Sequence, residues 1–211
     1  MNAVALLGGT FDPVHFGHLR AALEAQELLG SNDFRLLPAG TPPHRGAPSA
    51  DASHRLAMLE LAVARHPQLS VDDRETRRSG YSWMTDTLDE IRREEGDKPL
   101  ILLIGQDAAN GLDTWHRWER LFGLCHLVVM RRPDSGIAYS SVLRCEMEKR
   151  EISTVDGLAR EPAGSVLPLE ITQLEISSTS IREILADGRS PGFLMPESVI
   201  DYIHQNRLYG A

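Results

Sequence analysis

Short apolar runs alternate with amphipathic stretches along the chain. The apolar runs predict β-strands over residues 3–7, 34–38, 69–72, 100–104, 125–130 and 166–169. Apolar residues at helical spacing predict helices over residues 17–29, 52–64, 83–95, 115–122, 140–149, 179–186 and 196–206. Strands that alternate with helices favour an α/β fold, in which a Rossmann-like open parallel sheet carries helices on both faces.

Local signals support several of these elements. The run at 100–104 reads Leu-Ile-Leu-Leu-Ile, as expected for a strand that is buried on both faces. Gly188 follows the helix at 179–186 and suits a left-handed C-terminal cap, and Pro196 suits the first turn of the last helix. Residues 40–51 are rich in Pro and Gly, which predicts an irregular loop.

Length and composition narrow the class of protein. With 211 residues and 42% hydrophobic content, the chain suits one domain over 1–211, with a core over 1–175 and a small C-terminal helical part over 176–211. No apolar stretch is long enough to span a bilayer, and the N-terminus lacks the features of a signal peptide. Cys125 and Cys145 predict two free thiols, so we expect a cytoplasmic protein.

The net charge of −8 argues against binding to nucleic acid. An anionic ligand would therefore need a local group of cationic side chains, hydroxyls and helix N-termini. In a sheet of the predicted kind, such a group belongs at the carboxyl ends of the strands.

The stretch GGTFDPVHFGH, residues 8–18, follows the first predicted strand. Gly8 and Gly9 permit a tight turn, Thr10 adds a hydroxyl, and His15 and His18 flank the start of a helix. Unpaired backbone N–H groups and the helix dipole favour an anion there. Two alternatives remain open: an ordinary glycine turn with His15 as a helix cap, or a metal held by both histidines with Asp12 or His44.

A second group of polar residues forms ISSTSIR, residues 176–182. Ser177 or Ser178 suits a helix N-cap, and Ser178 and Arg182 share one helix face because they are four residues apart. The alternative is an ordinary serine cap with a solvated arginine. Two helix starts of this type predict one polyphosphate site that is built from both segments.

These two stretches resemble the signature motifs of the bacterial nicotinate-nucleotide adenylyltransferases, within the nucleotidyltransferase superfamily marked by (H/T)-x-G-H. Segments at 42–45 (PPHR), 104–107 (IGQD), 114–115 (TW) and 131–133 (RRP) also match in order. The resemblance implies the nucleotidyltransferase type of the α/β fold. It further implies transfer of AMP from ATP to nicotinate mononucleotide, by direct in-line attack on the α-phosphate, with release of pyrophosphate.

The resemblance also assigns residues to the two substrates. His18, His15 and Arg182 become the catalytic residues, with His18 at the α-phosphate and Arg182 at the β- and γ-phosphates. The implied ATP-binding residues are Gly8, Gly9, Thr10, His15, His18, Gly105, Asp107, Ser177, Ser178, Thr179 and Arg182. The implied mononucleotide-binding residues are His44, Arg45, Trp83, Met84, Thr85, Trp115 and Arg132.

One position departs from the family pattern, which usually reads Ser-Tyr-Thr where this chain reads Ser82-Trp83-Met84. Met84 has no hydroxyl for the nicotinate carboxylate, so backbone N–H groups, with Thr85 nearby, are the expected substitute.

Mg²⁺ is expected to arrive on the ATP phosphates without fixed protein ligands. Another phosphate acceptor, such as nicotinamide mononucleotide or phosphopantetheine, and a non-catalytic nucleotide sensor are the alternatives. A homo-oligomer is left open.

Overall fold

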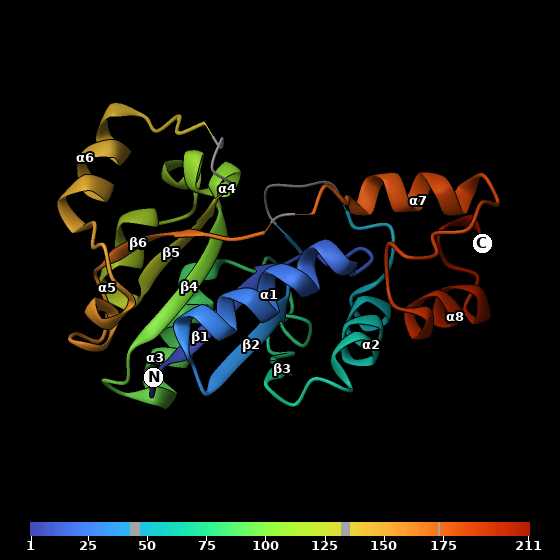
Figure 1. The fold of residues 1–211 in the computed structure, drawn as a ribbon, viewed down its shortest axis with the longest axis horizontal. Coiled ribbons are helices and arrows are strands. Elements are labelled where there is room, and N and C mark those ends of the chain that lie inside the picture. Colours follow the sequence, from blue (N-terminus) through green and yellow to red (C-terminus); the bar gives the residue numbers. More distant parts are fainter. Residues whose placement is uncertain (43–46, 132–135, 173) are drawn as a thin grey trace.

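A six-stranded parallel sheet forms the centre of the molecule (Figure 1). The computed structural model describes residues 1–42, 47–131, 136–172 and 174–211. The strands are β1 (Val4–Gly9), β2 (Asp33–Pro38), β3 (Leu69–Val71), β4 (Leu100–Gly105), β5 (His126–Arg131) and β6 (Val166–Glu170). Their order is β3-β2-β1-β4-β5-β6, so the direction of winding reverses between β1 and β4.

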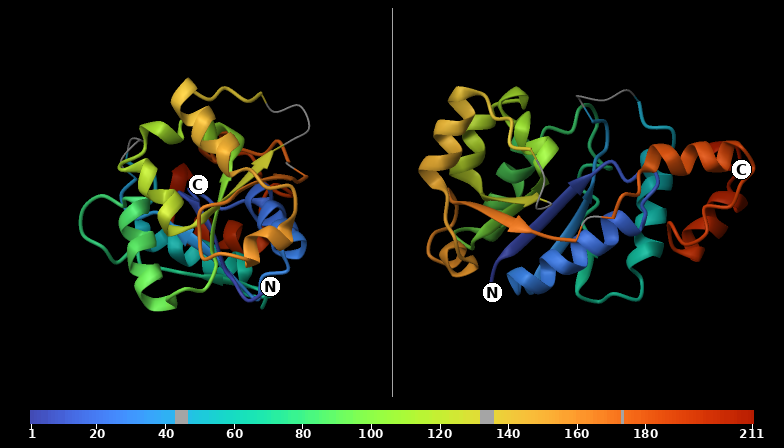
Figure 2. Two further views of the ribbon diagram at one scale, coloured as in Figure 1. Left: turned by 90° about the vertical axis from the view of Figure 1, so that its left-hand side faces the viewer. Right: turned by 45° about the horizontal axis from the view of Figure 1, so that its top comes forward.

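Helices cover both faces of this sheet (Figure 2). They are α1 (Phe16–Leu29), α2 (Ala52–Val63), α3 (Met84–Glu95), α4 (Gln106–Asn110), α5 (Leu121–Leu124), α6 (Ser141–Arg150), α7 (Ser178–Ala186) and α8 (Glu197–Gln205). Single turns of 3₁₀-helix lie at η1 (Leu112–Thr114), η2 (Trp118–Arg120), η3 (Val155–Ala159) and η4 (Leu208–Gly210).

Alternate residues of β1, β4, β5 and β6 belong to two separate hydrophobic cores, one on each face of the sheet. In β4, Ile101 and Leu103 pack with α1, α2 and α8 on one face, whereas Leu100 and Leu102 pack with α3 and α5 on the other. This double burial explains the continuous apolar run of β4. The C-terminal helices α7 and α8 lie beyond α2, at the opposite end of the molecule from α6 (Figure 1).

The pattern of apolar residues located every strand to within about two residues, which is the usual uncertainty of element ends. Gly188 has φ of 67°, so the predicted left-handed cap is confirmed. Pro196 is the N-cap of α8 and lies one residue before its first turn. The predicted free state of Cys125 and Cys145 is also confirmed. Among the helices of the described residues, none has the length and apolar character that a bilayer span requires.

The helix predicted over 115–122 is wrong. Trp115 has an extended backbone, and Arg117 adopts a left-handed conformation with φ of 52°. A helix cannot continue through such a residue. The segment is therefore divided into η2 and α5, and the short helix α4 before it was not predicted.

Candidate active site

A cavity of about 520 Å³ opens at the carboxyl ends of β1 and β4. Strand order reverses at this point, and ligands of open parallel sheets bind there. The predicted site residues that line it are Gly8, Gly9, Thr10, His18, Trp83, Met84, Thr85, Gly105 and Trp115. Segments that are distant in the sequence therefore converge on one cavity.

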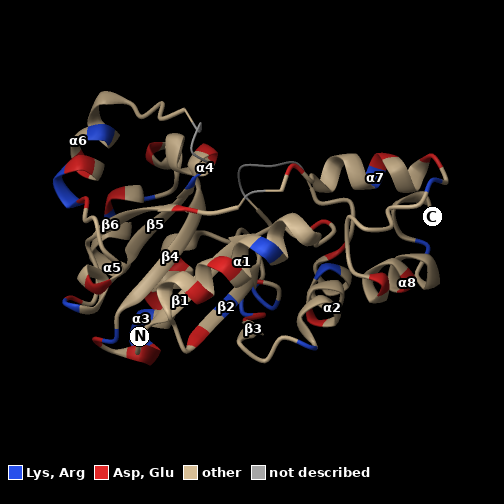
Figure 3. Ribbon diagram, in the orientation of Figure 1, with Lys and Arg blue, Asp and Glu red and all other residues tan. Residues whose placement is uncertain are grey.

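Acidic and basic residues are interspersed over the helices (Figure 3). An anionic ligand therefore depends on the cationic side chains and helix N-termini that line its own site.

The loop after β1 is held close to the segment before α7. A Cβ at position 17 would lie 2.9 Å from Nδ1 of His15 and 3.4 Å from the backbone oxygen of Ile176. Gly17 is therefore required because the imidazole of His15 and the second motif both press against it. Gly17 of the first motif is thus explained by its close contact with Ile176 of the second motif.

His15 and His18 stack on each other at the start of α1. Their ring centroids are 3.7 Å apart with 24° between the planes, and His18 also meets the ring of Phe11 edge-on. His15 is the N-cap residue of α1, yet its side chain makes no capping hydrogen bond, which argues against the simple capping alternative. Within the described residues its buried Nδ1 has no hydrogen-bond partner.

Burial lowers the pKa of His15 to about 4, so its imidazole is neutral near pH 7. A neutral ring avoids the desolvation cost of a buried charge. Because the unfolded chain binds the proton near the ordinary value of 6.5, stability from this group is fully present above about pH 6.5 and is lost as pH falls toward 4.

We therefore expect the free energy of unfolding to fall more steeply with acidification in the native protein than in His15→Gln. The difference in slope should reach at most about 1.4 kcal/mol per pH unit between pH 6.5 and 4. Denaturant titrations across this range measure it. His204→Gln, which changes an exposed histidine on α8, should keep the native slope. Parallel slopes for the native protein and His15→Gln would contradict a buried neutral His15.

The second motif starts α7 and faces the loop of the first. Ser177 is the N-cap, and its hydroxyl accepts a hydrogen bond from the backbone N–H of Ser180 at 3.1 Å. Ser178 donates to the backbone oxygen of Pro13 at 3.0 Å, and Arg182 donates to that of Asp12 at 2.6 Å. The predicted common face of Ser178 and Arg182 is thus confirmed. The Arg182 side chain remains 28% exposed, and Nη2 contacts the hydroxyl of Thr179 at 3.4 Å.

Asp12 and Arg55 support these loops, and sequence reasoning missed both of these roles. The Asp12 carboxylate accepts hydrogen bonds from the N–H groups of Ser49 and Ala50 and from the hydroxyl of Tyr209. Arg55, which is 1% exposed, donates to the backbone oxygens of Thr10, Ala39, Gly40 and Ala50. An arginine inside an amphipathic helix gives no sign in the sequence that it is buried.

The metal alternative gains no support from these contacts. The carboxylate of Asp12 is occupied by N–H and O–H donors, which a cation would have to displace. In the part of the chain that the structure describes, no three His, Cys, Asp or Glu side chains are grouped as a metal site. His44, the other suggested ligand, lies outside the described residues.

Aromatic side chains and the start of α3 form the wall of the cavity opposite Gly8. The Trp83 ring lies 4.6 Å from that of His116, and Met84 reaches to within 3.2 Å of where a Cβ of Gly8 would stand. Thr85 is 1% exposed and its hydroxyl donates to the backbone oxygen of His116 at 3.4 Å. The Thr85 hydroxyl is thus engaged with backbone, whereas the first N–H groups of α3 have no acceptor within the helix.

Glu75 also lines this cavity, and no sequence pattern singled it out. It is 2% exposed and accepts a hydrogen bond from the Thr87 hydroxyl at 2.7 Å. Arg78 in turn donates to that hydroxyl at 2.9 Å. Burial raises the pKa of the Glu75 carboxyl, since desolvation disfavours its charged form. Glu75 therefore joins the segment before Ser82 to the start of α3.

The remaining predicted residues divide into two groups. Asp107 is exposed in the first turn of α4, directly beyond Gly105, and does not line the cavity. His15, Ser177, Ser178, Thr179 and Arg182 belong to the adjoining junction between the loop after β1 and α7. His44, Arg45 and Arg132 lie outside the described residues.

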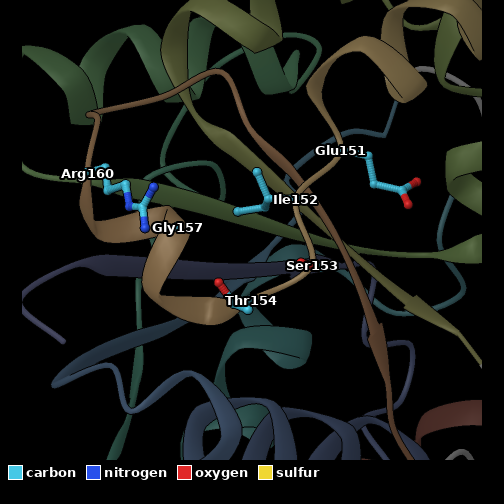
Figure 4. A pocket seen from close by; sticks show the side chains of 6 residues that line it. All are labelled: Glu151, Ile152, Ser153, Thr154, Gly157 and Arg160. Atoms are coloured by element: carbon cyan, nitrogen blue, oxygen red, sulfur yellow. The ribbon is translucent and has the colours of Figure 1, made fainter.

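A separate cavity of about 420 Å³ lies between the segment after α6 and η3 (Figure 4). Its charged lining residues, Glu151 and Arg160, stand on opposite sides of Ile152. Among the described residues of the two motifs, none lines this second cavity. The chemistry-bearing residues of the motifs gather instead at the carboxyl ends of β1 and β4 and at the adjoining start of α7.

Two helix N-termini meet beside an aromatic cavity at the point where strand order reverses, and in α/β proteins with open parallel sheets such positions suit phosphate-bearing ligands. The cytidylyltransferase-like family model matches residues 6–184. A Methylococcus capsulatus protein named probable nicotinate-nucleotide adenylyltransferase is 49% identical over 207 residues, covering 98% of this chain and 99% of that protein. Its namesake in Acidithiobacillus ferrooxidans is 46% identical, with 98% and 95% covered.

The chain therefore belongs to the cytidylyltransferase-like family and, within it, to the nicotinate-nucleotide adenylyltransferases. The fold agrees with this assignment. The structure of Plasmodium falciparum nicotinic acid mononucleotide adenylyltransferase, complexed with NaAD, superposes with a TM-score of 0.76 over 100% of this chain and 98% of that one, at 15% identity. The predicted resemblance and the nucleotidyltransferase type of fold are confirmed.

Proposed function

We propose that this protein transfers AMP from ATP to nicotinate mononucleotide, giving nicotinate adenine dinucleotide and pyrophosphate. The observation that carries the proposal is the junction of the two motifs, where Arg182 and Ser178 of α7 bind the loop that holds His15 and His18. Full-length relatives that carry the name of this activity support it.

The reaction needs position and charge stabilisation rather than a protein nucleophile. An oxygen of the mononucleotide phosphate attacks the α-phosphorus of ATP, and the bond to the bridging oxygen breaks on the opposite side. The departing pyrophosphate takes the electron pair of that bond. His18 donates to the α-phosphate, and Arg182 holds the β- and γ-phosphates with the hydroxyls and N–H groups of residues 177–179.

Mg²⁺ accompanies ATP in this proposal. The donors of the junction are imidazoles, a guanidinium, hydroxyls and N–H groups, which suit phosphate oxygens better than a cation. Bound to the triphosphate, Mg²⁺ neutralises charge on the phosphate oxygens. The protein side of the site therefore needs no carboxylate directed at the metal.

The mononucleotide occupies the aromatic cavity. Its pyridine ring lies against Trp115 and Trp83, and its carboxylate meets the first N–H groups of α3 at Met84 and Thr85, where the helix dipole favours an anion. Gly105 and Asp107 hold nucleotide ribose.

On the resemblance alone, we also assign the mononucleotide phosphate to His44 and Arg45, and anion attraction to Arg132. The free thiols favour a reducing, cytoplasmic setting.

A side-by-side assay with the acid and amide mononucleotides tests the proposal. We expect pyrophosphate release that depends on ATP, Mg²⁺ and nicotinate mononucleotide, with a higher kcat/KM for the acid than for the amide. If nicotinamide mononucleotide or phosphopantetheine gives product but nicotinate mononucleotide gives none, nicotinate mononucleotide is refuted as the acceptor. ATP binding without turnover on any of these acceptors would favour a nucleotide sensor.

Trp115→Ala should raise the KM for the mononucleotide by about tenfold and change that for ATP much less, because ring stacking contributes about 1 kcal/mol or more. Trp115 lines the cavity from the extended segment after η1. Steady-state kinetics with each substrate varied in turn measure the two constants. Equal increases in both would instead assign Trp115 a general structural role.

A further inference from the structure

Asp12 joins the catalytic loop to a part of the chain almost at its end. Its Oδ1 accepts hydrogen bonds from the Tyr209 hydroxyl at 2.7 Å and the Ala50 N–H at 3.1 Å, and its Oδ2 accepts one from Ser49 N–H at 2.7 Å. The residue is 6% exposed and lies three positions before His15. The side chain of Asp12 is thus satisfied by three donors from two segments.

Tyr209 is held in place for this contact. It lies in η4, with φ of 59° and ψ of 18°, a left-handed conformation that costs free energy for a residue with a Cβ. The Arg207 backbone is also left-handed, with φ of 50°. Burial, followed by the nearby Asp12 carboxylate, holds the pKa of Tyr209 above its usual value. The phenol therefore stays protonated and donates to Asp12.

Arg182 lies beside the same Asp12 carboxylate that Tyr209 contacts. Nη1 of Arg182 lies 2.6 Å from the backbone oxygen of Asp12 but 4.0 Å from the Oδ2 atom of its carboxylate. A direct ion pair between the guanidinium and the carboxylate would be shorter and bidentate. Such a pair would draw Arg182 down onto the loop and cancel the charge that a triphosphate needs.

We propose that Tyr209 is a positioning residue that holds the Asp12 carboxylate away from Arg182, so that the guanidinium stays available to the β- and γ-phosphates of ATP. The same contact orders the loops below the site. Ala50, which donates to Asp12, accepts a hydrogen bond from Arg55 at 3.1 Å, and Arg55 reaches Thr10 and Gly40. Tyr209 is thereby linked to the loops after both β1 and β2.

Tyr209→Phe tests the proposal, and Tyr202→Phe is its matched control. Tyr202 is a partly buried phenol in the same C-terminal part, but its hydroxyl bonds Nδ1 of His54 on α2. For Tyr209→Phe we expect an approximately tenfold higher Kd for ATP with Mg²⁺ by calorimetry and an unchanged KM for nicotinate mononucleotide. Tyr202→Phe should stay within about twofold of the native protein in both constants.

A purely structural role of Tyr209 would give a different result. Calorimetry measures the Kd for ATP of the folded protein, and thermal denaturation measures its stability, so the two effects can be separated. If Tyr209→Phe loses stability like Tyr202→Phe while the Kd for ATP stays native, the proposal is overturned. Equal losses of affinity for ATP and the mononucleotide would overturn it as well.

The inference rests on the proposed function, and the two can fail separately. A native protein that makes no product from nicotinate mononucleotide refutes the proposed acceptor. The comparison of ATP affinity between Tyr209→Phe and Tyr202→Phe still decides the role of Tyr209 in that case.

Discussion

His18→Ala is expected to lower kcat by about a hundredfold, the effect of removing one preorganised donor to a developing negative charge. His18 lines the cavity, and its ring is fixed between the edge contact with Phe11 and the stack with His15. Because both rings are held by these contacts, His18 as the proposed donor needs little reorganisation when charge builds on the α-phosphate. KM for ATP should change much less than kcat.

His204→Ala is the matched control for this experiment, since His204 is an exposed residue of α8. Within the described residues, its side chain has no contact with either motif. It should retain native turnover. Steady-state kinetics and thermal denaturation of both variants separate a catalytic loss from a folding defect. Near-native kcat in a folded His18→Ala protein would remove His18 from the mechanism.

Arg182→Ala is expected to lower kcat/KM for ATP by about a hundredfold or more, because a guanidinium paired with phosphate makes a strong, charge-assisted contact. The leaving pyrophosphate gains charge during the reaction, so kcat should fall together with the affinity for ATP. The KM for the mononucleotide should change far less. Arg182→Lys should recover only part of the loss, since one ammonium group cannot donate in the same fork geometry.

Arg189→Ala provides the control for charge. Arg189 is exposed and pairs with Asp187 just after α7. Its replacement therefore removes one positive charge, as Arg182→Ala does, but at a site away from the junction of the motifs. Arg182 also donates to the backbone oxygen of Asp12, so denaturation must accompany the kinetics. An unchanged kcat/KM for ATP in a folded Arg182→Ala protein would place the triphosphate elsewhere.

Local patterns were sufficient for most elements, and particular residues show where they were not. Ser177 caps α7 and Gly188 ends it, because a hydroxyl acceptor and a left-handed glycine are local solutions to unpaired backbone groups. The same reasoning failed at 115–122. Apolar spacing there indicated a helix, but Arg117 adopts a left-handed conformation that no periodicity reveals.

The candidate site was predicted to a similar extent. Both motifs could be located, and their convergence could be expected because they lie at strand ends and helix starts. The hydrogen-bond partner of each side chain, by contrast, could not be predicted from the sequence. In the sequence Asp12 stood out only as a possible metal ligand, and no pattern singled out Arg55. In the structure Asp12 receives three hydrogen bonds, and Arg55 is buried under the loops.

The sequence by itself determined the α/β class, most helix and strand positions and the two helix starts that carry the motifs, because each depends on residues within a few positions of one another. The tertiary structure alone decided the strand order, the stack of His15 on His18 and the contacts of Asp12. Arg182 and Tyr209 reach Asp12 across 170 and 197 positions of chain. Contacts at such separations leave no periodic trace in the sequence, since they form only when the sheet has placed its strand ends together.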